Sequence, residues 1–173
     1  MHSKKRTVMI FPEFNNINYI DELREKYDSL SDKVRPHITL IFPFESSLDK
    51  TKIFEILYNR LHKIKPFEIS VQGLSVMNRW LVLNVTNGAN ILTEIHTILY
   101  ANEFLSYKPA WLGNYVPHIT VGAFDSSEEA ANVYEKERYF NNIFNCVIDK
   151  ISVEIIGKNE QSIIEIEYLL DRI

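Results

Sequence analysis

Residues 34–42, VRPHITLIF, and residues 115–123, YVPHITVGA, contain the same tetrapeptide, Pro-His-Ile-Thr. In a β-strand, side chains two residues apart point to the same face. His37 and Thr39 are therefore expected to project together, as are His118 and Thr120, with the intervening isoleucine facing the packed side. Each copy then presents an imidazole and a hydroxyl separated by two strand steps, about 7 Å along the backbone.

The segments around the two copies repeat in the same order. Each copy follows a segment with apolar residues at helical spacing and precedes another such segment and then two strand-like segments. The predicted helices span about 18–30, 48–63, 90–104 and 128–139, and the predicted strands lie near 7–11, 36–42, 67–73, 80–85, 117–124, 144–156 and 162–170. A repeated order of elements around a repeated motif indicates a duplicated structural unit.

The turns after the two copies also match, because Phe44-Glu45-Ser46-Ser47 corresponds to Phe124-Asp125-Ser126-Ser127. Serine and acidic residues are favoured at the N-cap and in the first turn of a helix. We therefore predict an α+β fold of two pseudo-symmetric lobes, with mostly antiparallel sheets flanked by helices. Residues 1–173 are expected to form one domain, with lobes at roughly 13–86 and 87–173 and intertwined terminal strands.

Charge and composition narrow the classes of function. The formal net charge of −4 argues against a protein that coats nucleic acid through bulk electrostatics, but leaves open a small anionic ligand in a local basic pocket. The single cysteine, Cys146, cannot form an intrachain disulfide, which fits a reducing compartment. The apolar run before Pro12 is too short for a signal peptide, and no segment is long enough to span a bilayer. We expect a cytoplasmic protein, with no membrane partner.

The paired motifs suit phosphodiester chemistry if the two lobes bring them together. A histidine near its reference pKa of about 6.5 can act as acid or base at neutral pH, so two imidazoles can divide these roles. Two hydroxyls can donate hydrogen bonds to the non-bridging oxygens of a phosphate. One His-x-Thr motif alone is more often a polar strand face, and it is the repetition that favours a functional site.

At this point the sequence resembles the 2H phosphoesterase superfamily, and within it the 2′-5′ RNA ligase-like proteins. The signature of that superfamily is two H-x-[S/T]-hydrophobic motifs, one in each lobe. Here they are His37-Ile38-Thr39-Leu40 and His118-Ile119-Thr120-Val121, and the preceding Pro36 and Pro117 also match a form common in the family. The likeness covers nearly the whole chain.

The resemblance implies a bilobal fold with a central cleft and metal-independent action on 2′,3′-cyclic phosphate or 2′-5′ phosphodiester linkages. By motif match, His37 and His118 take the catalytic roles, and Thr39 and Thr120 bind the substrate phosphate. The implied partner is an RNA end or a nucleotide, no cofactor is implied, and a monomer is expected. Which histidine is the acid and which the base stays open.

Other residues carry weaker hypotheses. In the loop 106–117, Lys108, Trp111 and Tyr115 could contact a base or a phosphate, or could pack the loop onto its lobe, and Arg35 is a comparable candidate. His62 and His96 are interpreted as structural or solvent-facing, since each lies on a predicted helix. No carboxylate falls at metal-ligand spacing around either motif, so a metal site is rejected as the leading interpretation.

Two alternatives to an enzyme remain. The same cleft could capture a nucleotide or RNA end without turnover, as a non-catalytic binding module. The chain could also be an unrelated α+β scaffold in which duplication reused a stable strand. In a scaffold of that kind the two imidazoles would point away from each other.

Overall fold

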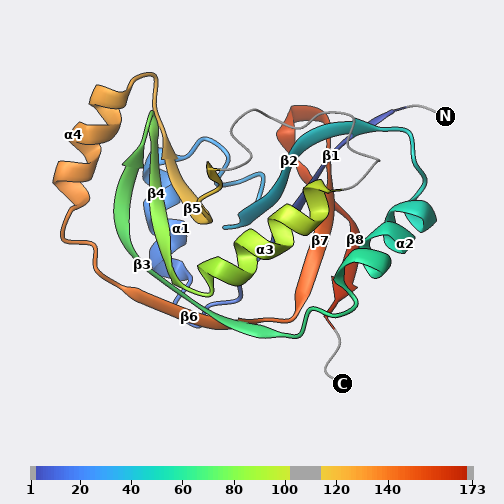
Figure 1. The fold of residues 1–173 in the computed structure, drawn as a ribbon. Helices are drawn as coiled ribbons and strands as arrows, with labels where there is room; N and C mark the ends of the chain where they lie inside the picture. The colour runs from blue at the N-terminus through green and yellow to red at the C-terminus, as the bar shows by residue number, and fades with distance from the viewer. Residues whose placement is uncertain (1–2, 102–113, 171–173) are drawn as a thin grey trace.

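The computed structural model describes residues 3–101 and 114–170, and their strands form two four-stranded antiparallel sheets (Figure 1). The strand order is β2-β1-β7-β8 in the first sheet and β5-β4-β3-β6 in the second sheet. In chain order the elements are β1 (Lys4–Ile10), α1 (Asn18–Tyr27), β2 (Ile38–Ser46), α2 (Lys50–Leu61), β3 (Phe67–Met77), β4 (Trp80–Asn87), α3 (Ala89–Tyr100), β5 (His118–Ala123), α4 (Ser127–Glu137), β6 (Ile143–Ile148), β7 (Lys150–Ile156) and β8 (Ser162–Leu169). The predicted α+β architecture of two antiparallel, helix-flanked lobes is confirmed.

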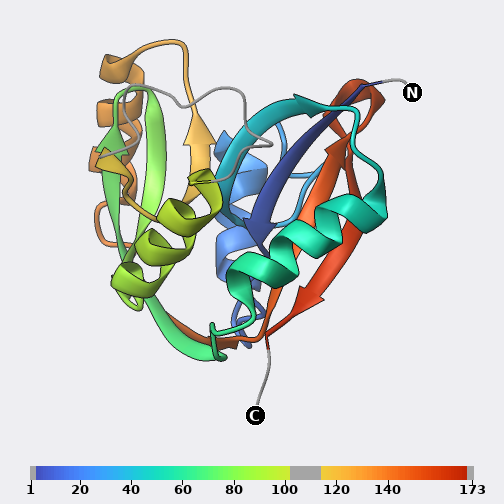
Figure 2. The same ribbon diagram turned by 45° about the vertical axis from the view of Figure 1, so that its right-hand side comes forward.

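The two Pro-His-Ile-Thr segments occupy corresponding places in the two sheets. Each lies at an edge strand, β2 or β5, and each pairs with a neighbour in the same register. Thr39 lies opposite Met9 of β1, and Thr120 lies opposite Val82 of β4. The duplication inferred from the sequence is therefore visible in the strand pairing. Figure 2, together with Figure 1, shows the two edge strands side by side at the junction of the sheets, and β2 contacts β5 directly.

The sheets divide the chain differently from the expected lobes at 13–86 and 87–173. β3 and β4 pair with β6 and β5 in the second sheet, while β7 and β8 return to β1 in the first. The expected single strand near 144–156 is two strands, β6 and β7, which separate at Asp149 and join different sheets. Hydrophobic alternation shows that a segment is a strand, but does not show which partner satisfies its backbone groups.

The two helices after the motifs begin with different caps. Ser126 caps α4, because its side chain accepts a hydrogen bond from the Glu129 backbone N–H at 3.1 Å, as the sequence predicts. In the first half, β2 continues through Ser46, and the cap of α2 is Asp49, which accepts from the Lys52 N–H at 2.8 Å. The turn predicted at residues 44–47 is therefore wrong, since three of these residues belong to β2.

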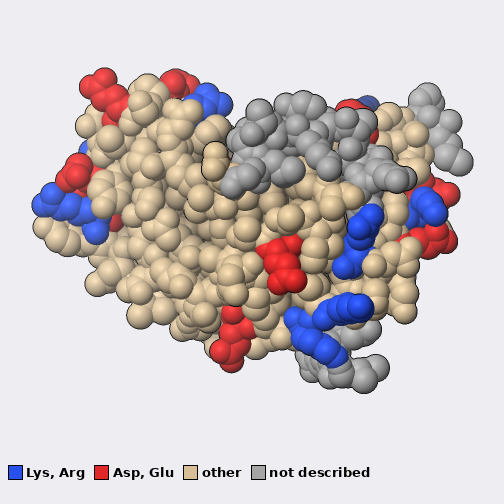
Figure 3. Space-filling model, in the orientation of Figure 1, with Lys and Arg blue, Asp and Glu red and all other residues tan. Residues whose placement is uncertain are grey.

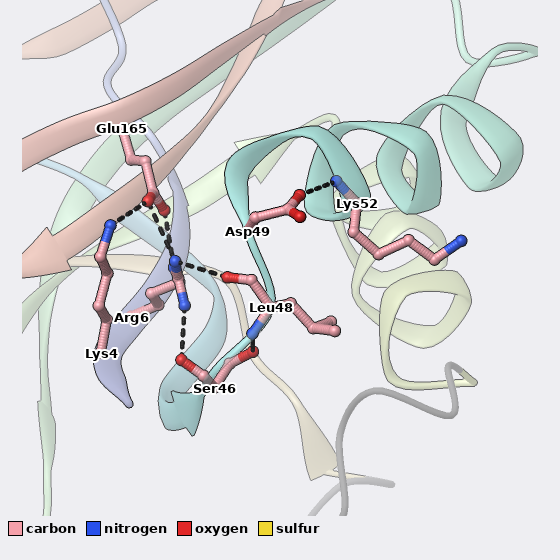
Figure 4. A network of polar contacts seen from close by, with 7 residues as sticks. All are labelled: Lys4, Arg6, Ser46, Leu48, Asp49, Lys52 and Glu165. Carbon is pink, nitrogen blue, oxygen red and sulfur yellow. Dashed lines mark hydrogen bonds and ion pairs between the residues drawn. The ribbon is translucent and has the colours of Figure 1, made fainter. Parts of the chain in front are cut away.

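A buried arginine ties the outer part of the first sheet together (Figure 4). The Arg6 side chain of β1 is 1% exposed and donates to the Glu165 carboxylate of β8, with Nε to Oε2 at 2.6 Å. It also donates to the backbone carbonyls of Ser46 and Leu48, at 2.7 and 3.0 Å. Lys4 adds a second cation beside Glu165. The hydrogen bond from Arg6 and, to a smaller extent, that from Lys4 hold the pKa of this carboxyl below its usual value. This network joins β1, β8 and the connection from β2 to α2.

The core and the surface are consistent with an ordinary globular fold. The isoleucines inside the two motifs, Ile38 and Ile119, are fully buried, as predicted for their side of each strand. On the face shown in Figure 3, described charged side chains lie in small separate groups of both signs rather than in one broad basic surface. Every helix in residues 3–101 and 114–170 is too short or too polar to span a bilayer.

Candidate active site

The two motif histidines are held in the same way. The Nδ1 atom of His37 lies 2.8 Å from the Arg35 carbonyl oxygen, and the Nδ1 atom of His118 lies 2.7 Å from the Val116 carbonyl oxygen. A carbonyl oxygen can only accept a hydrogen bond, so Nδ1 carries the proton in each neutral imidazole. The lone pair of each ring is therefore at Nε2, at the far end of the ring from the backbone. Both histidines present the same tautomer for proton transfer.

Burial favours the neutral form of both rings. Desolvation lowers the pKa of His37 most; the nearby positive charge of Arg24 and that of His118 also lower it, while the hydrogen bond to Arg35 and the negative charge of Asp28 oppose the shift. Desolvation likewise lowers the pKa of His118, against the hydrogen bond to Val116. A neutral imidazole at neutral pH is the form that a general base needs.

The two motifs lie in one region of the molecule. β2 contacts β5, and the two rings are near enough for the charge of His118 to affect the pKa of His37. The hydroxyl of Tyr115, three residues before His118, donates to the Thr39 carbonyl oxygen at 2.8 Å. This arrangement argues against the scaffold alternative, in which the imidazoles would point away from each other.

The threonine hydroxyls of the motifs differ from those of structural threonines. Thr7, Thr93 and Thr97 each donate to a backbone carbonyl, at 2.6 to 2.8 Å. No protein hydrogen bond occupies the side chain of Thr39 or Thr120 within the described part of the chain, and both residues are half-buried. Their hydroxyls are therefore available to donate to an anion between the two strands.

The side chain of Tyr115 makes contacts within the protein through both its ring and its hydroxyl. Its ring stacks on that of His96, with centroids 3.8 Å apart and planes at 6°, and its hydroxyl is bound by the first motif. His96 is buried and its Nδ1 lies 2.7 Å from the Leu40 carbonyl oxygen, so the structural interpretation of His96 fits its position. Burial, followed by the nearby Tyr100, raises the pKa of Tyr115 well above its usual value. The structure favours the packing alternative for Tyr115 over a contact with substrate.

We expect Tyr115→Phe to loosen the first motif rather than to weaken substrate binding. The variant removes the hydrogen bond to the Thr39 carbonyl but keeps the stack on His96. The free energy of unfolding should fall by about 0.5–1.5 kcal/mol, with a several-fold decrease in kcat and little change in KM. Urea unfolding and initial rates test this, with Tyr58→Phe at an exposed position of α2 as control. A raised KM with unchanged stability would instead make Tyr115 a substrate contact.

Of the remaining candidates, Arg35 lies beside the first motif. Its guanidinium carbon is 4.5 Å from the centroid of the Phe11 ring, and that ring lies 6.1 Å from the His37 ring. Arg35 is exposed, so its charge is available to an anionic ligand near His37. Lys108 and Trp111 lie outside the described residues.

The sequence analysis missed a buried ion pair next to the segment that leads to His37. Arg24 of α1 is 1% exposed and its Nε donates to Asp28 Oδ2 at 2.9 Å. The same guanidinium donates to the backbone carbonyls of Val34 and Leu30, at 2.8 and 3.3 Å. It therefore holds the segment that leads into the first motif. The four-residue spacing of Arg24 and Asp28 is a sequence signal for an ion pair, but does not indicate its burial.

The described residues contain no group of three or more His, Cys, Asp or Glu side chains that could hold a metal ion. A hollow of about 280 Å³ lies next to Phe11 and is lined by Glu13, Asp149 and Lys150 among others, but neither motif histidine lines it.

Comparison with known proteins gives concordant results. The sequence model of the 2′-5′ RNA ligase superfamily matches residues 12–159. A protein of Geobacillus thermodenitrificans named "Putative phosphoesterase" is 29% identical over 153 residues, which cover 84% of each chain. A Bacillus cereus protein of the same name is 29% identical over 156 residues, covering 84% of this chain and 85% of its own.

Among solved structures, LigT of E. coli in complex with 3′-AMP aligns with a TM-score of 0.64 at 17% identity, covering 99% of this chain and 100% of LigT. At that identity the likeness concerns the fold alone.

Proposed function

This chain belongs to the 2′-5′ RNA ligase superfamily, and from that premise we propose that it is a phosphodiesterase acting on 2′,3′-cyclic phosphate or 2′-5′ linkages of RNA or nucleotides. The observation that carries the proposal is the matched pair of histidines. Both have Nδ1 tied to a backbone carbonyl, both have a lowered pKa, and both lie at adjoining edge strands. One ring can then remove a proton while the other supplies one.

The residues divide the reaction as follows. One Nε2 takes a proton from the attacking oxygen as the new P–O bond forms, and the other imidazole, protonated, gives its proton to the oxygen that leaves phosphorus. The hydroxyls of Thr39 and Thr120 donate to the non-bridging oxygens, where charge accumulates in the transition state. Arg35 adds a positive charge on the His37 side. Every step uses side chains of this chain.

Nucleotides are the proposed ligand class on two grounds. The site offers hydrogen-bond donors for a phosphate from both lobes, and LigT, which shares the fold, has been crystallised with 3′-AMP, ATP and NADP⁺. An RNA end carries the same terminal group as a nucleotide. The cytoplasmic location and the monomeric state stay predictions.

The direct test is phosphorus NMR of a panel of 2′,3′-cyclic mononucleotides and a 2′-5′-linked dinucleotide, incubated with the protein in EDTA. We expect the cyclic phosphate resonance to be replaced by that of a 2′- or 3′-monophosphate, which reports turnover and regiochemistry together. Saturable binding with no product after long incubation would support the non-catalytic binding module instead. Absence of both turnover and binding would refute the proposal.

The pH dependence follows from the direction of the two pKa shifts. Burial lowers the pKa of both histidines below about 6.5. The histidine that acts as base is therefore already neutral at about pH 6.5, and the histidine that acts as acid has already lost its proton at that pH. A bell-shaped kcat/KM profile is therefore expected, with its maximum on the acidic side of about pH 6.5. The kcat profile should be displaced to higher pH, since a bound phosphate anion favours the imidazolium. Initial rates across the range from acidic to mildly basic pH measure both, and a kcat/KM that keeps rising into basic pH would contradict the assignment.

A further inference from the structure

Asn84 lies beside His118 on the same face of the second sheet. The two residues are directly opposite each other across β4 and β5. Cross-strand partners of this kind share a face, with Cβ atoms about 5 Å apart. Asn84 is half-buried. Its side chain therefore belongs to the surface that carries the second motif.

The amide group of Asn84 is fixed by a bulge in β3. Its Nδ2 donates to the Gly73 carbonyl oxygen at 3.0 Å and to the Ser75 hydroxyl oxygen at 2.8 Å. Gly73 has a φ of 77°, and the β3–β4 register shifts between Val71 and Leu74, which frees the Gly73 carbonyl from the ladder. Such bulges often re-aim a side chain next to a functional site. Because a carbonyl cannot donate, the nitrogen must face Gly73, and the orientation of the amide is determined.

The oxygen of this amide remains as a fixed acceptor. Both N–H groups of Nδ2 are used toward β3, and Oδ1 lies on the other arm of the planar group. β5, with His118, is on the opposite side of β4 from β3. Within the described residues, no hydrogen bond uses Oδ1. An amide oxygen can only accept, so its partner must be a group that donates.

The corresponding place in the first lobe has different chemistry. The matched registers of Thr39 with Met9 and of Thr120 with Val82 make Phe11 the counterpart of Asn84. Beside His37 there is thus an aromatic ring carrying the Arg35 guanidinium, and beside His118 there is an acceptor. A cation suits the side where the leaving oxygen develops negative charge. An acceptor suits the side of an attacking water, which has two protons and gives only one to the base.

We propose that Asn84 positions the attacking water, accepting a hydrogen bond at Oδ1 from one O–H while Nε2 of His118 removes the other proton. This deepens the proposed function and rests on it. The water oxygen then bonds to phosphorus, the bond from phosphorus to a ribose oxygen breaks, and that oxygen receives a proton from His37. Asn84 is a positioning residue, because it takes no proton itself.

The test compares Asn84→Leu with two other variants on a 2′,3′-cyclic mononucleotide. Asn84→Leu keeps the size of the side chain and removes the acceptor, so kcat should fall about 10- to 100-fold, as expected when a reacting atom is misplaced. KM and the dissociation constant for 3′-AMP should change less than threefold, because the water contact contributes only to the reaction. Ser75→Ala removes one of the two bonds that hold the amide and should lower kcat by a smaller factor.

Asn145→Leu is the matched control, since Asn145 lies on the far edge strand of the same sheet and accepts a hydrogen bond from Ser70 at 2.7 Å. It should leave kcat within twofold of wild type. An Asn84→Leu variant with wild-type kcat would overturn the inference while the proposed function stands. A kcat loss accompanied by equally weakened 3′-AMP binding and a lowered melting temperature would overturn it in favour of a structural role. A wild-type protein without turnover would overturn the proposed function and the inference together.

Discussion

His37→Ala and His118→Ala are each expected to reduce kcat on a 2′,3′-cyclic mononucleotide by about 10²–10⁴-fold, the usual contribution of a positioned acid or base. Each variant removes one of the two Nε2 atoms that transfer protons, but leaves Thr39 and Thr120 in place to hold the phosphate. KM should therefore change far less than kcat. The two losses should not add in the double variant, because a reaction that has lost its base gains little from the remaining acid.

A control and a pH profile make this test specific. His62→Ala removes an exposed imidazole whose Nδ1 lies 3.1 Å from the Tyr58 carbonyl, an arrangement like that of the motif histidines but on a helix away from them. Its activity should equal that of wild type. The residual activity of each motif variant should also lose one limb of the bell-shaped profile, and the limb lost identifies the base and the acid. Two active single variants would end the two-histidine mechanism.

Local features of the site could be predicted from sequence because they follow from strand geometry. The alternation of His37, Ile38 and Thr39 fixes which side chains share a face, and the burial of Ile38 agrees with it. The same holds for the second motif. Repetition of the motif then indicated a duplicated fold, and the matched register of the edge strands agrees with that inference.

The remaining features depend on contacts between segments distant in sequence. Tyr115 binds a carbonyl in β2, and Asn84 is held by a bulge in β3, so neither role is visible in local periodicity. β7 pairs with β1, and this pairing satisfies backbone hydrogen-bonding groups of both strands. Any other strand could satisfy the same groups, so the partner is not visible in the sequence. In this chain the hydrophobic pattern indicates which segments are strands, but not which sheet each strand joins.

Arg24→Met is expected to have the largest effect on stability. The variant leaves the Asp28 carboxylate, whose side chain is 7% exposed, without its cation, and removes the guanidinium hydrogen bonds to the Val34 and Leu30 carbonyls. Removing one partner of a buried ion pair typically costs about 3–5 kcal/mol. Urea unfolding should show a lower midpoint with an unchanged slope. Lys26→Met, at an exposed position of the same helix, serves as control and should be close to neutral.

The same variant should also change the first motif, because Arg24 holds the segment that leads to His37 and its charge lowers the pKa of that ring. Removing the cation while keeping the Asp28 anion should raise the pKa of His37, which an NMR titration measures. Arg24→Met combined with Asp28→Asn removes both charges and keeps a side-chain oxygen to accept from the Leu30 N–H, so part of the lost stability should return and the His37 pKa should move back toward the wild-type value. If the double variant is no more stable than Arg24→Met alone, the unpaired carboxylate is not the cause of the loss. The defect would then come from the lost hydrogen bonds of the guanidinium to the Val34 and Leu30 carbonyls.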